Sequence, residues 1–228
     1  MYVPSPFPEP VTVIDSVASQ KYDVRLLFTK QAMTGQFALM GVISILSMVI
    51  PHLNITTQNL WWIALCAMIA LNTVRRLING PIETILSYLS FISLAVTLSQ
   101  VGQRLMEWGY PAWILPVSAF LALSYAWLCG RDFSFAGCAF FTAFAAVGMT
   151  TILAFMGWVH WQDVGWAVVV ALTYTGYITY DLAMIMKRRR PDELLTAVID
   201  FYRDVLNFVF YPFRVWLHWK KYRFISPL

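Results

Sequence analysis

The sequence predicts an all-α fold, a polytopic bundle of membrane-spanning helices, and its composition gives the first evidence. The 228 residues are 59% hydrophobic and only 12% charged, with a mean hydropathy of +0.63. A water-soluble domain carries charge on roughly a quarter of its residues. From Gln31 to Val74 there is no Asp, Glu, Lys or Arg, which leaves room for two spans of about 20 residues each and a turn.

Seven candidate spans follow from this run, the later apolar runs and the turn residues between them. The first run divides at the turn 51–58, and its second half ends at Arg75 and Arg76. Glycine beside proline, asparagine or charge marks further turns near 79–81, 109–111 and 130–132. The remaining candidate spans are 84–103, 108–130, 134–162, 164–186 and 194–217.

These spans predict a simple domain organisation. Residues 1–30 form a proline-containing N-terminal tail without a signal-peptide core, in which 23–29 is expected to lie along the membrane surface. Residues 31–217 form one seven-helix membrane domain, and 218–228 form a short basic C-terminal tail.

The basic residues predict the orientation of the chain. Ten of them lie before the first span or in the loops after the second, fourth and sixth, whereas the opposite loops contain only Arg104. Because cytoplasmic loops are rich in Lys and Arg, the amino terminus is predicted to be cytoplasmic. Seven crossings place the basic C-terminal tail on the other side, and a re-entrant seventh segment is the alternative. The basic residues form no patch interleaved with aromatic residues, so nucleic acid is not a predicted partner.

Three acids are the candidate functional residues, because they alone fall inside the candidate spans. They are Asp181 in the sixth apolar run and Asp200 and Asp204 in the seventh. An ionisable side chain inside hydrocarbon costs about 2.5–3.5 kcal/mol on insertion scales, so it is retained mainly where it has a partner or a function.

Residues 178–181 read ITYD and residues 202–208 read YRDVLNF. These stretches resemble the two closing signatures of the Bax inhibitor motif-containing transmembrane family, aliphatic-x-Tyr-Asp and Tyr-x-Asp-x-x-Asn-aromatic. Residues 28–41, 70–81 and 120–137 are more loosely similar, so the resemblance covers most of the chain from Arg25 to Trp216.

The resemblance implies six helices in two layers around a central seventh, and a calcium leak channel or a regulator of stored calcium and cell death. It also implies a pH-sensitive gate formed by Asp181 and Asp204, with Arg75 or Arg76 as an arginine latch. Two carboxylates in a poorly solvated place tend to share a proton. They are too few for a tight calcium site, so weak binding of a permeant calcium ion is expected, with no cofactor.

The sequence leaves alternatives open for each acid. Asp181 is either a gate residue or a solvated partner of Lys187 or Arg188. Asp200 is either a gate residue or a local partner of Arg203, which lies three residues further along a helix. Asp204 lies near Asn207 in an aromatic-rich segment and is the strongest candidate.

The sequence also departs from the family pattern. Arg203 stands where an aliphatic residue is usual, Leu182 where Thr is common, and Asn72 where many members carry an acid. These departures favour the alternative function, a non-conducting membrane scaffold or accessory subunit with membrane-protein partners. An enzyme is not predicted, because no span combines a nucleophile with a base or carries a His-rich metal cluster.

Overall fold

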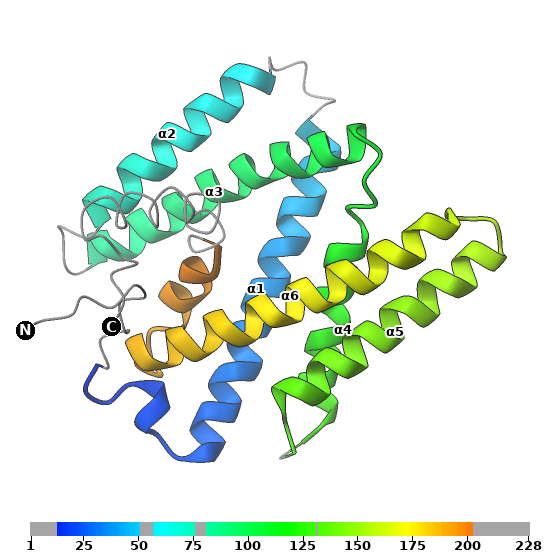
Figure 1. Ribbon diagram of the computed structural model, residues 1–228. Helices are drawn as coiled ribbons and strands as arrows, with labels where there is room; N and C mark the ends of the chain where they lie inside the picture. Colours follow the sequence, from blue (N-terminus) through cyan, green and yellow to red (C-terminus); the bar gives the residue numbers. More distant parts are fainter. Residues whose placement is uncertain (1–12, 51–56, 76–80, 131, 203–228) are drawn as a thin grey trace, which may run out of the picture.

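The computed structural model describes residues 13–50, 57–75, 81–130 and 132–202 of the chain (Figure 1). All regular structure in these ranges is helical, which confirms the predicted all-α class. The elements are η1 (Val17–Ser19), α1 (Tyr22–Val49), α2 (Thr57–Arg75), α3 (Pro81–Glu107), α4 (Ile114–Leu128), α5 (Phe135–Phe155) and α6 (Trp161–Arg188). A further helical segment, here called the terminal segment, begins at residue 194 and continues to 202, where the described part ends.

Four of these helices are long and apolar enough to cross a membrane: α1, α3, α5 and α6. At 1.5 Å per residue, the 28 residues of α6 exceed the roughly 30 Å of hydrocarbon in a bilayer. Helix α4 is apolar but has only 15 residues. The chain is therefore a multi-pass integral membrane protein.

The ends of two helices differ from the predicted ones. Helix α1 begins at Tyr22, so residues 23–29 continue the first helix. Phe28, Ala32 and Met33 are buried on one face, and no proline occurs between Tyr22 and Pro51. Helix α3 likewise extends beyond the predicted span 84–103, from Pro81 to Glu107. In both cases, charged residues lie within the terminal turns of a continuous helix.

The helices form two groups joined by α1. Helices α2 and α3 pack together, as do α4, α5 and α6, and α1 contacts both α3 and α4 (Figure 1). One buried cluster runs through these elements and includes Phe28, Leu94 and Leu182.

The terminal segment, orange in Figure 1, lies against α1 and α6. All six residues from 197 to 202 are buried. The closest approach is at Gly35 of α1, where an added Cβ would lie 2.6 Å from Val198 Cγ2. Glycine thus allows this segment to pack directly against the backbone of α1.

Candidate functional site

Helix α6 positions the first candidate acid. The helix begins with a reciprocal cap between His160 and Asp163 and ends with Lys187 and Arg188 in its last turn, where positive charge is favourable. Asp181 lies on the same buried face as Ile178 and Ile185 and is 3% exposed. The alternative of a solvated Asp181 is therefore wrong, because its carboxylate lies inside the bundle.

Tyr177 connects Asp181 to the terminal segment. The phenol lies one turn before Asp181 on α6, and its hydroxyl is 3.1 Å from Asp181 Oδ2. The same hydroxyl also donates to the backbone carbonyl of Phe201. This one side chain therefore contacts a buried acid of α6 and the backbone of the terminal segment.

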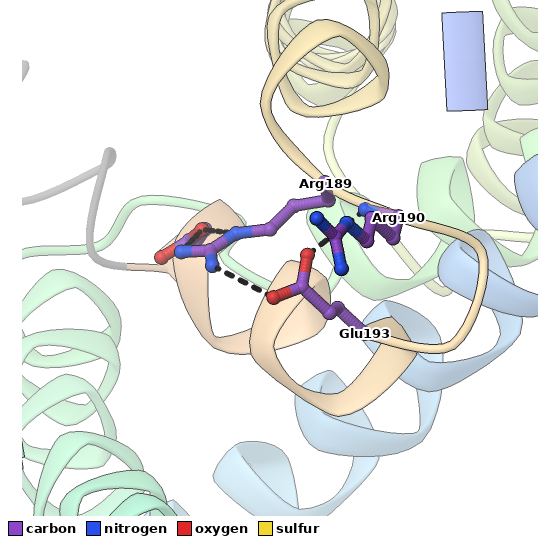
Figure 2. Close-up of polar contacts among 4 residues, drawn as sticks. Arg189, Arg190 and Glu193 are labelled. Atoms are coloured by element: carbon purple, nitrogen blue, oxygen red, sulfur yellow. Dashed lines mark hydrogen bonds and ion pairs between the residues drawn. The ribbon is translucent and has the colours of Figure 1, made fainter. Parts of the chain in front are cut away.

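Asp200 has an ion-pair partner that the sequence did not indicate. Arg189 follows the last residue of α6, and its Nη2 and Nε lie 2.6 Å and 2.8 Å from Asp200 Oδ2 (Figure 2). The Asp200 side chain is 4% exposed and that of Arg189 is 24% exposed. A buried carboxylate is stable as an anion when a cation and hydrogen bonds compensate it. Arg189 supplies both.

The connector between α6 and the terminal segment orients this arginine. Glu193 accepts a hydrogen bond from the Arg190 backbone N–H at 2.9 Å through Oε2, and its Oε1 lies 3.7 Å from Arg189 Nη1 (Figure 2). Pro191 lies inside this short turn and cannot continue the helix. Arg189 is thus held between two carboxylates, one at the surface and one in the core.

A second polar contact joins α1, α6 and the terminal segment. Tyr174 donates a 2.7 Å hydrogen bond to Gln36 Oε1, and Tyr202 donates to the Gln36 backbone carbonyl. All three residues are buried. Buried polar groups need such partners, so the contact fixes the relative positions of the three elements.

The remaining predicted site residues are not described. Arg203, Asp204, Asn207 and Arg76 lie outside the described residues, and Arg75 ends α2 with its side chain undescribed. The Asp181–Asp204 pair, its weak calcium site and the arginine latch therefore stay predictions. Within the described ranges, no group of three or more His, Cys, Asp or Glu residues could hold a metal ion.

Two residues of the site were not predicted from the sequence. Tyr177 precedes Asp181 by four residues, a spacing that places two side chains on one helix face, and this signal was present. Arg189 was used only as one of the basic residues that predict the orientation of the chain in the membrane. Its pairing with Asp200 depends on the conformation of the connector, which no comparable sequence pattern predicts.

Comparison with known proteins finds a distant and partial relative. Over 97 residues, the chain is 29% identical to mouse Protein lifeguard 4, a member of the Bax inhibitor motif-containing family. The matched region is 42% of this chain and spans 41% of the length of that protein. No family model matches the chain, and no solved structure matches it.

Proposed function

We propose that this membrane protein is a Bax inhibitor-like calcium leak channel, or a regulator of calcium homeostasis and cell death, gated by buried aspartates. The burial of Asp181, which Tyr177 connects to the terminal segment, carries the proposal. A carboxylate kept there at a cost in stability indicates a function. The partial similarity to Protein lifeguard 4 supports the same type of membrane protein.

The chemistry of Tyr177 explains how the gate would respond to pH. Its hydroxyl has a single proton, yet it lies within hydrogen-bond reach of two acceptors, Asp181 Oδ2 and the Phe201 carbonyl. When Asp181 is protonated, its own O–H donates to the phenol oxygen and leaves the phenol proton for Phe201. When Asp181 is charged, both acceptors compete for one proton, and the contact between α6 and the terminal segment weakens.

Asp204 is the proposed second carboxylate of the gate, with Asp200, Arg203 and Asn207 beside it in sequence. A singly protonated pair would hold the two helices together. Loss of that proton as pH rises, or neutralisation by calcium, would release them. Arg75 or Arg76 is the proposed latch.

Calcium flux from loaded liposomes tests the gate. The parent is expected to leak more as pH rises, whereas Asp181→Asn and Asp204→Asn mimic the protonated acid and should leak little at every pH. Asp132→Asn removes an exposed carboxylate and is the matched control. Leak from both gate variants that follows the parent at all pH values would rule out the aspartate gate.

A non-conducting scaffold is the second candidate, and a groove between α5 and α6 favours it. The groove has a volume of about 490 Å³, and its lining includes Ala136, Ala139, Gly176 and Ala183. Small residues on adjacent helices allow another membrane helix to approach closely. Isolation in mild detergent tests this alternative: a stoichiometric membrane-protein partner together with absent calcium flux would support it over the channel.

A further inference from the structure

The chain before α1 folds back onto the end of α6. Residues 13–20, here called the N-terminal strap, include η1 and contact both α6 and α1. The Val13 backbone N–H donates to the Lys187 carbonyl at 3.0 Å, and the Val17 N–H donates to the Arg189 carbonyl at 2.8 Å. A helix end leaves its last carbonyls without partners inside the helix. The strap provides donors for two carbonyls at this end.

The middle of the strap, Ser16 and Val17, is part of the core. Ser16 and Val17 are both 0% exposed, and Val17 belongs to the same buried cluster as Ile185 and Phe201. The strap also stabilises its own shape, because Ser19 Oγ donates to the Ser16 carbonyl at 2.7 Å. Asp15 turns the chain into η1 with φ 61°, a conformation that Asp tolerates better than most residues.

The second hydrogen bond links the strap to the acidic site. It is made to Arg189, whose side chain forms the ion pair with Asp200 in the terminal segment. The backbone of Arg189 is extended here, with φ −116° and ψ 148°, because α6 has ended. The position of the guanidinium therefore depends on contacts outside α6, and the strap supplies one of them.

We propose that the N-terminal strap is an intramolecular lock that caps α6, holds Arg189 on Asp200 and keeps the terminal segment closed against α1 and α6. Release of the strap frees the connector 189–193 and loosens the terminal segment. Any effect of the lock on calcium leak rests on the proposed function, whereas its effect on packing does not.

A pair of variants at Val17 tests the hydrogen bond. Val17→Pro removes the N–H that bonds to the Arg189 carbonyl and puts the ring Cδ in its place, whereas Val17→Ala keeps the N–H and removes both Cγ methyl groups. Proline fits this position, because Val17 is the first residue of η1 and a first helical position suits its fixed φ. Ser16 has ψ 158°, which is the conformation preferred before proline. Ile14→Ala, in the strap but 81% exposed, is the control.

Amide hydrogen exchange in lipid nanodiscs is the primary measurement. Exchange at 197–202 is expected to be up to about tenfold faster in Val17→Pro than in Val17→Ala, because a net backbone hydrogen bond is worth about a factor of ten. The Ile14→Ala variant should match the parent. Val13→Pro, which removes the bond to Lys187, serves as the second variant should Val17→Pro fail to fold.

The outcomes separate the lock from the channel. Faster exchange confined to 187–202 supports the lock, and a parallel rise in calcium leak supports gating through it. Faster exchange with unchanged leak supports the lock and counts against the proposed channel. Unchanged exchange at 197–202 overturns the lock, whatever the calcium leak does. An equal rise of the exchange rate in α2 and α3 also overturns it, because it would show a general loss of stability.

Discussion

Arg189 and Asp200 form an ion pair in which two guanidinium nitrogens approach the same carboxylate oxygen, at 2.6 Å and 2.8 Å. The pair joins the residue that follows α6 to a segment whose last six described residues are all buried. Because Asp200 lies in the core and Arg189 is partly at the surface, Asp200 without its partner should cost more stability than Arg189 without its partner.

Arg189→Gln should therefore destabilise the protein. The substitution leaves the Asp200 carboxylate buried without its cation, and a cost of about 2 kcal/mol is expected, below the value for a fully buried pair because Arg189 is partly exposed. Chemical unfolding in detergent measures this cost. Arg188→Gln removes the same charge one residue earlier, at an exposed position, and should have little effect.

A double-mutant cycle then tests the pair itself. Arg189→Gln with Asp200→Asn should be more stable than the sum of the single changes predicts, by at least about 0.5 kcal/mol, because neither charge is then left alone. Strict additivity would show that the two residues act independently.

Gly35→Ala should disturb the contact between α1 and the terminal segment. The new methyl group would lie 2.6 Å from Val198 Cγ2, and a β-branched residue has few rotamers with which to move away. The expected loss of unfolding free energy is about 1–3 kcal/mol. Thermal unfolding in detergent measures it, and Val198→Ala in the same chain should restore part of the loss.

Gly41→Ala is the matched control on the same helix. A Cβ at this position meets nothing within 4 Å, and alanine favours a helix over glycine by about 0.5–1 kcal/mol. Gly41→Ala should therefore be neutral or slightly stabilising. Equal effects at the two glycines would indicate helix propensity rather than the close approach.

Tyr177→Phe should reduce the pH response of the calcium leak while keeping the fold. The ring stays in place, but the hydroxyl that lies between Asp181 and the Phe201 carbonyl is lost. Under the proposed function, the change of calcium leak with pH should be flatter than in the parent, with a stability cost of about 1 kcal/mol. Tyr180→Phe, at a residue 62% exposed, should keep the pH response. If the leak of Tyr177→Phe changes with pH as the leak of the parent does, the phenol is not part of the gate.

The sequence predicted the helices better than their ends. Charge-free runs and turn residues located α1 to α6, because membrane spans impose long apolar stretches on any sequence. The start of α1 at Tyr22 and the end of α3 at Glu107 were not predicted. Charged residues can continue a helix where the hydrocarbon ends, and composition alone does not distinguish this case from a surface segment.

The site was predicted in part for a similar reason. The cost of a buried charge indicated Asp181 and Asp200 as notable residues, and both are buried. The partner of Asp200 was not predicted, because Arg189 reaches it across a turn eleven residues away. The capping of α6 by Val13 and Val17 uses backbone groups, which leave no signature in side-chain identity.

Gln36 gives a last test, because its contacts with Tyr174 and Tyr202 join three elements in the core. Gln36→Leu leaves the buried Tyr174 hydroxyl without its acceptor, at an expected cost of about 1–3 kcal/mol in unfolding free energy. Adding Tyr174→Phe removes the unsatisfied hydroxyl and should recover much of this loss, since replacing both partners by apolar groups is often close to neutral. Gln31→Leu, on the exposed face of α1, should change stability little. A double variant no more stable than Gln36→Leu alone would mean that Gln36 contributes through packing and not through its hydrogen bond to Tyr174.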